Sequence, residues 1–129
     1  MKQNVYLYDV FFDEEEGISV VSLMTPHGIF SGKAKLNVDE DQWNEITGGT
    51  IAELRAWKNY YKHEIKLRKF AIHELNTVYS QMKKNWRRKL LADRITFLEL
   101  EVDACKAEIK SVDDEINARL ARLEKIGQK

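Results

Sequence analysis

The stretch Leu91–Ile116, LADRITFLELEVDACKAEIKSVDDEI, decides the fold of this chain. Apolar residues recur in it at alternating intervals of four and three positions. They are Leu91, Ile95, Leu98, Val102, Cys105, Ile109, Val112 and Ile116. A period of 3.5 residues is typical of a helix that packs lengthwise against another helix, as in a coiled coil. We therefore predict a long helix over residues 86–126, with an interruption at Arg119 and a stop signal at Gly127.

The preceding segment predicts the helix against which this one packs. Neither glycine nor proline occurs between Thr50 and Ile126. Apolar residues again recur every three or four positions, with gaps at Lys58 and Arg68. They are Ile51, Leu54, Tyr61, Ile65, Ile72, Leu75, Tyr79, Met82 and Trp86. We predict a first long helix over residues 50–84.

The limits of this helix follow from local signals. After Gly48 and Gly49, the sequence TIAE (Thr50–Glu53) matches a capping box at a helix start. One continuous helix from there to Ile126 would be on the order of 110 Å long at 1.5 Å per residue. Asn85 is a suitable N-cap for a second helix, and we favour an antiparallel hairpin that bends near residues 84–86.

The first third of the chain predicts strands. VYLYDVFF (5–12), ISVVSLM (18–24) and IFSGKAKL (29–36) are rich in β-branched and aromatic residues, and DEEEG and TPHG between them are turn signals. Gly32 inside the third run indicates a bulge or a close backbone approach. We predict a three-stranded antiparallel meander over 1–37, a connector over 38–49 and one α+β domain over 1–129.

Charge is unevenly distributed along a chain with zero formal net charge. Residues 1–50 carry three cations and nine acids, residues 51–89 eleven cations and three acids, and residues 90–129 seven cations and nine acids. This asymmetry favours self-association or capture of an anion by the middle segment. A long nucleic acid is disfavoured, because both acidic flanks would repel it.

Signals for catalysis, metals and membranes are weak. The chain lacks the GxGxxG, Walker, CxxC and HExxH motifs, and His63 and His73 are ten residues apart. Cys105, the single cysteine, lies on the apolar seam, as expected of a core residue. Without an apolar run of membrane-spanning length or a signal-peptide pattern, we expect a cytoplasmic protein that is not an enzyme and has no cofactor or metal.

The basic stretch MKKNWRRK (Met82–Lys89) at the expected bend is the best candidate for a binding site. Arginine offers paired donors to phosphate, an aromatic ring offers a stacking face, and asparagine can bind a base edge or a ribose hydroxyl. The candidates are Tyr79, Asn85, Trp86, Arg88 and Arg94. Trp86 has a competing interpretation as core packing at the bend.

A second basic feature lies on the first predicted helix. Its cations are three or four positions apart and form a stripe, made of Arg55, Lys58, Lys62, Lys66 and Lys69. The competing interpretation is a solvated face that pairs with the acidic strands.

The segments TPHGIFSGKAKLN (Thr25–Asn37) and GGTIAELRAW (Gly48–Trp57) resemble a pattern in small bacteriophage proteins. With the meander before them and the long helices after, the chain is similar to the first type of Thoeris anti-defence protein. The resemblance covers the architecture of nearly the whole chain and local motifs over about a fifth of it.

The resemblance implies a non-enzymatic sponge in the host cell cytoplasm. Members of that family are homo-oligomers, dimers assembled into hexamers, that sequester cyclic ADP-ribose isomers made by TIR-domain immune enzymes. Some members hold cyclic trinucleotides at a separate site. It implies pocket roles for an aromatic residue late in the first helix, an asparagine near the bend and an arginine on the second helix, with His27 in the relevant turn. It also implies Arg55 as a candidate for the cyclic-oligonucleotide site.

A different class of function remains open from the sequence. The gaps at Lys58, Arg68 and Arg119 leave room for a partner helix, which is typical of a coiled-coil protein-binding inhibitor or a structural phage protein without a small ligand. The residues leave open the ligand isomer and the oligomeric state.

Overall fold

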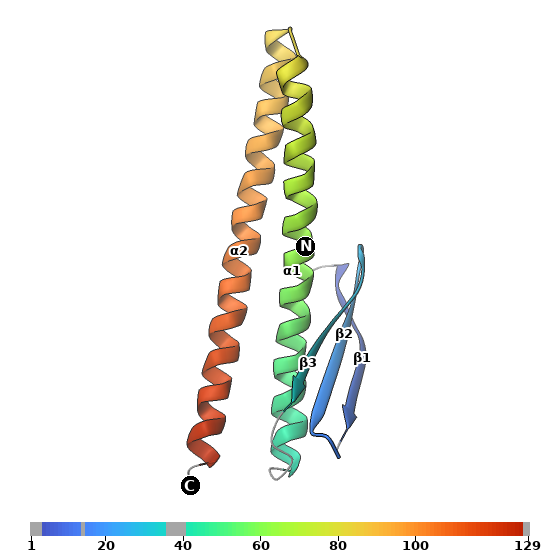
Figure 1. Cartoon of the computed structure of the whole chain (residues 1–129), viewed down its shortest axis with the longest axis vertical. Helices are drawn as coiled ribbons and strands as arrows, with labels where there is room; N and C mark the ends of the chain where they lie inside the picture. Colours follow the sequence, from blue (N-terminus) through green and yellow to red (C-terminus); the bar gives the residue numbers. More distant parts are fainter. Residues whose placement is uncertain (1–3, 14, 36–40, 128–129) are drawn as a thin grey trace. The chain divides into compact units, whose positions relative to one another are not determined.

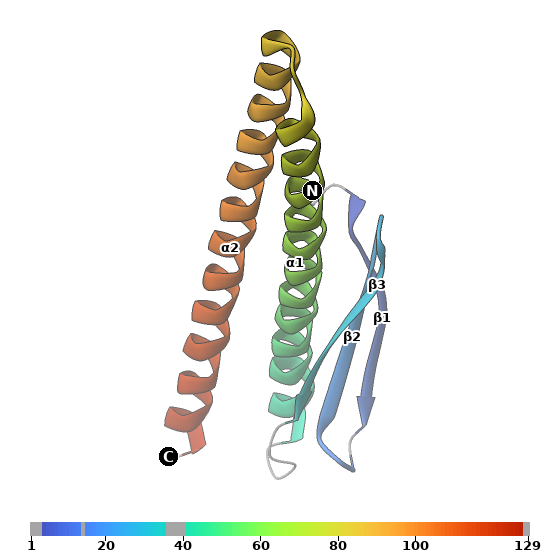
Figure 2. The same cartoon turned by 45° about the horizontal axis from the view of Figure 1, so that its top comes forward.

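The computed structural model describes residues 4–13, 15–35 and 41–127, with only the backbone described for 41–46 and 123–127. The elements are β1 (Tyr6–Asp13), β2 (Ile18–Thr25), β3 (Gly28–Lys35), α1 (Asp41–Gln81) and α2 (Asn85–Gly127), as drawn in Figures 1 and 2. The predicted α+β fold, a three-stranded antiparallel meander followed by a helical hairpin, is confirmed. The predicted end of the third strand at Leu36 and the first part of the connector lie outside the described residues.

The chain divides into two compact units, residues 1–60 with 110–129 and residues 61–109. The first unit contains the sheet, the early turns of α1 and the late turns of α2. The second unit contains the bend between the helices and the turns on either side of it. The assignment of 1–129 to a single domain stays a prediction.

Both hairpin turns of the sheet form where their sequences indicate. Asp13 Oδ1 accepts hydrogen bonds from the backbone N–H groups of Glu15 (3.0 Å) and Glu16 (3.3 Å), and Gly17 has φ 65°. In the next turn Thr25 Oγ1 donates to the carbonyl of Gly28 (2.7 Å). These local side-chain bonds fix the turns and give the strand order β1-β2-β3.

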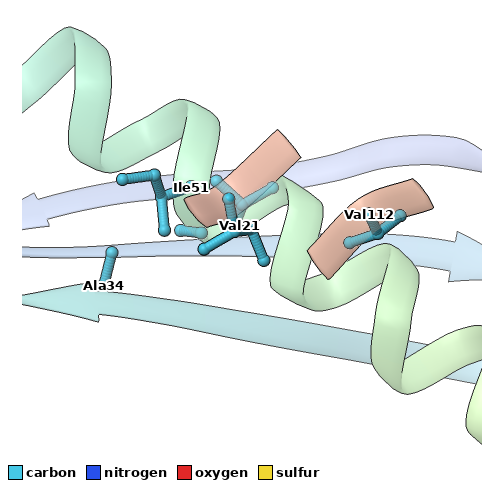
Figure 3. Packing of buried hydrophobic residues seen from close by; sticks show 6 residues of the cluster. Val21, Ala34, Ile51 and Val112 are labelled. Carbon is cyan, nitrogen blue, oxygen red and sulfur yellow. The ribbon is translucent and has the colours of Figure 1, made fainter. Parts of the chain in front are cut away.

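One face of the sheet packs against the early turns of α1. Figure 3 shows Val21 of β2 and Ala34 of β3 with Ile51 of α1 and Val112 of α2. Gly32 lies opposite Val21 and two residues before Ala34 on this face, without a register shift in the β2–β3 ladder. A Cβ built on Gly32 would overlap the backbone of α1, with the carbonyl carbon of Arg55 only 2.8 Å away. Of the two interpretations of Gly32, close backbone approach is therefore correct.

The first helix begins earlier than its capping signal predicts. It starts at Asp41, so the connector is shorter than 38–49 and the capping-box interpretation of Thr50–Glu53 is wrong. Gly48 and Gly49 lie inside the helix, where each costs about 1 kcal/mol relative to alanine. Burial of Ile51 and its neighbours in the next turn outweighs that cost.

The bend is longer than predicted and has a different cap: α1 ends three residues before the predicted residue 84, and α2 begins one residue before the predicted residue 86. The first helix ends at Gln81, and the Met82 N–H donates to the Tyr79 carbonyl (3.1 Å) in a tightened last turn. The Arg88 N–H donates to the Lys84 carbonyl (3.1 Å), so Lys84 holds the N-cap position. The assignment of the N-cap to Asn85 is therefore wrong by one residue, since Asn85 is the first residue of α2.

The apolar seam of α2 is confirmed. The buried members of the predicted series are Ile95, Leu98, Val102, Cys105, Val112 and Ile116. Ion pairs occupy two of the gaps in the α1 series: Lys58 Nζ lies 2.6 Å from Asp113 Oδ1, and Arg68 pairs with Glu64 and with Glu101 (3.4 Å). The charges of the cations that interrupt the seam of α1 are therefore paired within the chain.

Candidate functional site

Arginines stacked on aromatic rings surround the bend between the helices. The Arg88 guanidinium lies over the Tyr79 ring at 4.7 Å from its centroid, so this contact joins the last turn of α1 to the first turn of α2. Arg87 lies over the adjacent Trp86 ring at 5.1 Å. Stacking on a ring holds the guanidinium plane and leaves its N–H edges available for an anion.

The bend is strongly basic and uncompensated. Lys83, Lys84, Arg87, Arg88 and Lys89 are all exposed, and none makes an ion pair with any residue that the structure describes. Five like charges within seven residues repel one another, and an external anion would relieve that repulsion.

Trp86 is 58% exposed, so its interpretation as core packing at the bend is wrong for the single chain. An indole of this size in water offers a stacking face next to Asn85, whose amide is also exposed. The structure therefore brings Tyr79 and Arg88 into contact, and it places Asn85 and Trp86 in the same turn of α2 as Arg88.

Arg94 forms a separate pair one to two turns further along α2. Its guanidinium lies 5.9 Å from the ring centroid of Phe97, which is 52% exposed. Phe97 was not a candidate from the sequence, although its position three residues after Arg94 places both on one helix face.

The remaining candidates, His27 and Arg55, belong to the first unit. His27 lies exposed in the β2–β3 turn, where its backbone N–H donates to Thr25 Oγ1 (3.1 Å). Arg55 Nη1 donates to the carbonyl of Lys33 (2.8 Å) and so ties α1 to β3. This bond gives Arg55 a structural role, and its assignment to a second ligand site stays a prediction.

The rest of the basic stripe forms a hollow on α1. Lys62, Lys66 and Lys69, together with His63 and Ile65, line a surface hollow of about 450 Å³. Arg55 and Lys58 of the predicted stripe are bound to Lys33 and Asp113 instead. The stripe therefore divides into two parts. Its early members form contacts that stabilise the fold, and its later members are exposed to water.

Cys105 is fully buried on the seam of α2, which confirms its interpretation as a core residue. Burial is the largest cause that raises the pKa of its thiol, and the carboxylates of Glu64, Glu101 and Glu108 add to it, while Arg68 opposes them. A buried thiol with a raised pKa is a poor nucleophile at neutral pH.

We expect Cys105 to make stability fall in alkaline solution. Because its folded pKa exceeds its unfolded pKa, its contribution is fully present below the unfolded value, about 8.5. As pH rises from there through the folded pKa, the unfolded chain releases the proton first and the free energy of unfolding falls. Urea denaturation at several pH values, compared with Cys105→Ala, measures the effect, and an equal alkaline slope in both proteins would contradict it.

Among the described residues no group of histidine, cysteine, aspartate and glutamate side chains could hold a metal ion. Within the same ranges neither helix contains a segment long and apolar enough to cross a membrane. Searches with this chain find no matching family model, curated protein or solved structure.

Proposed function

We propose that this protein is a non-enzymatic sponge for a nucleotide signal of the cyclic ADP-ribose type. It would bind the signal in the cytoplasm of a phage-infected bacterium and keep it from its effector, thereby blocking a TIR-based defence. The protein would act as a homo-oligomer and return its ligand chemically unchanged.

The observation that carries this proposal is the Arg88–Tyr79 stack across the bend. It holds a guanidinium, whose N–H edges fit a phosphate group, in the first turn of α2, the turn that also carries Asn85 and the exposed Trp86. A cyclic ADP-ribose contains a diphosphate, a purine and two riboses. Guanidinium, indole and amide groups complement these three parts by charge, stacking and hydrogen bonding.

The compact size of such a ligand also agrees with the charge distribution. A long nucleic acid would meet the acidic segments that flank residues 51–89, and its binding would be strongly salt dependent. A ligand with one diphosphate contacts only the cations near the bend. Charge therefore favours a small anion over a duplex.

Replacing Arg88 tests the proposed site. We expect Arg88→Ala to weaken the binding of a cyclic ADP-ribose isomer by about 1.5–3 kcal/mol, the range for a lost hydrogen bond to a charged group. Isothermal titration calorimetry measures this loss. Arg88→Lys keeps the charge without the planar fork and should recover only part of it.

Lys106→Ala, an exposed cation of α2 outside the bend, is the matched control and should bind as the unaltered protein does. No heat of binding with folded protein would overturn the proposal. So would a chemically altered ligand after release by denaturation, because that would indicate catalysis.

A second candidate function is the binding of a protein partner, as an inhibitor or a structural phage protein without a small ligand. The observation that favours it is the set of exposed apolar side chains on β1, which are Tyr6, Leu7, Tyr8, Val10 and Phe11. The gaps at Lys58 and Arg68 no longer support it, because in-chain ion pairs fill them. Specific capture of one host protein, without nucleotide binding, would favour this alternative.

A further inference from the structure

The sheet has an outer face, opposite the face that packs on α1. The register pairs the strands so that directly opposed residues share a face. Ser19, Val21 and Leu23 of β2 are buried on the inner side, so Ile18, Val20, Ser22 and Met24 point outward. Reading from β1 to β3, the outer face consists of four rows: Asp13–Ile18–Lys35, Phe11–Val20–Lys33, Asp9–Ser22–Ser31 and Tyr6–Met24–Ile29.

Half of this outer face is apolar, and its large apolar side chains are open to water. Their exposed fractions are 61% for Tyr6, 55% for Phe11, 46% for Met24 and 53% for Ile29. The polar row Asp9–Ser22–Ser31 separates Phe11 and Val20 from Tyr6, Met24 and Ile29. A solvated face of an antiparallel sheet ordinarily carries polar residues, and exposed apolar side chains gathered on one face mark an interaction surface.

Charge on the outer face is divided between its two edges. The acids, Asp9 and Asp13, lie on β1, and the cations, Lys33 and Lys35, lie on β3. One strand separates them, so the two edges are about 9–10 Å apart. No ion pair links these four side chains to any described residue. Among the residues that the structure describes, the charges of this face thus have no ion-pair partner, and they are opposite in sign on its two edges.

We propose that the outer face binds the outer face of a second copy of this chain, with the two-fold axis parallel to β2. A rotation about that axis places β1 of each copy over β3 of the other. The acids of one copy then face the cations of its partner, twice, and the β2 side chains of the two copies meet in the middle. Sheets that pack face to face differ in strand direction by about 30°. This moves the ends of strands of eight residues sideways by about 6 Å, so β1 lies over β3 most closely at the middle rows, which carry Asp9 and Lys33.

The charges select this arrangement over the other symmetric ones. A two-fold axis perpendicular to the strands would place β1 on β1 and bring four carboxylates together. Pairing of the free edges of two β1 strands would also place Asp9 and Asp13 beside their own copies. Only the axis along β2 pairs opposite charges at both edges, as a self-complementary two-fold interface requires.

Charge reversal tests the arrangement. We expect Asp9→Lys and Lys33→Asp each to weaken dimerisation about tenfold or more, because each change acts twice in a two-fold interface and replaces attraction by repulsion. Sedimentation equilibrium at low salt measures the dimer dissociation constant. Both positions are exposed, and circular dichroism will verify that the variants fold.

Two rescues make the test specific. An equimolar mixture of the two single variants should form heterodimers about as strong as the unaltered dimer, since each copy then presents the charges that the other needs. The double variant Asp9→Lys/Lys33→Asp should dimerise by itself. Lys106→Asp, with the same charge change on exposed α2, should leave the dissociation constant unchanged.

Three results would overturn the proposal. The first is a monomer at all accessible concentrations. The second is tighter association of Asp9→Lys, as expected if β1 faces β1. The third is an absence of rescue in the mixture. None of these results depends on nucleotide binding, so the proposed sponge function can fail while this interface stands. The second and third results leave a homo-oligomer with another interface, so the sponge function can also stand while this interface fails; a monomer would count against both.

Discussion

The Gly32→Ala variant is expected to lose about 3 kcal/mol or more of its free energy of unfolding, the upper range for forcing atoms into a packed interior. The added methyl group would overlap Ala52 O and Ala56 N and lie 2.8 Å from the carbonyl carbon of Arg55. All three are backbone atoms, so no rotamer change can relieve the overlap. The early turns of α1 would have to move off the sheet and expose Ile51.

Urea denaturation followed by circular dichroism will measure this loss. Gly49→Ala is the matched control, because a Cβ at Gly49 meets no atom within 4 Å and the residue lies inside α1. We expect that substitution to stabilise the protein by about 0.5–1 kcal/mol through helix propensity. Equal stability of Gly32→Ala and the unaltered protein would mean that α1 and β3 do not approach as closely as described.

The sequence was sufficient to predict the elements whose signals are local or periodic. The turn at Asp13–Gly17 forms because a carboxylate and a glycine lie at the right positions, and these are visible as DEEEG. The seam from Leu91 to Ile116 is visible because apolar residues recur at positions on one face of the helix, and six of its eight members are buried. Such signals need no knowledge of the rest of the fold.

Boundaries that depend on packing were not predictable in this way. Gly48 and Gly49 are helix breakers by propensity, yet α1 continues back to Asp41 because its following turn is buried against the sheet. The bulge in β1 between Leu7 and Asp9 likewise has no glycine or proline to announce it.

The candidate site was predictable in composition and only partly in arrangement. The sequence MKKNWRRK predicts cations, an aromatic ring and an amide at the bend. The stacking of Arg88 on Tyr79 joins residues from different helices, so it depends on the length of the bend and not on a helical spacing. The exposure of Trp86 could not be inferred from the sequence. Trp86 continues the apolar spacing of the first helix, but α1 ends at Gln81, so that spacing no longer places Trp86 on the buried face.

The Arg68→Met variant is expected to lose about 3–5 kcal/mol of stability, the range for removing one partner of a buried ion pair. Arg68 donates to Glu64, whose side chain is only 2% exposed, and also reaches Glu101 Oε2 at 3.4 Å. Burial alone would lower the pKa of Arg68, but the two carboxylates raise it overall. The variant keeps an apolar stem of similar length and leaves the Glu64 carboxylate buried without its cation.

Two comparisons separate loss of the charge from loss of packing. The double variant Glu64→Leu/Arg68→Met should recover most of the stability, because an apolar pair of similar volume removes the uncompensated charge. Lys58→Met breaks the ion pair between Lys58, whose side chain is 27% exposed, and Asp113, whose side chain is 42% exposed. We expect this variant to lose less than about 1 kcal/mol of its free energy of unfolding. If the double variant is no more stable than Arg68→Met, the guanidinium contributes mainly through packing, and the buried carboxylate is not what destabilises the protein.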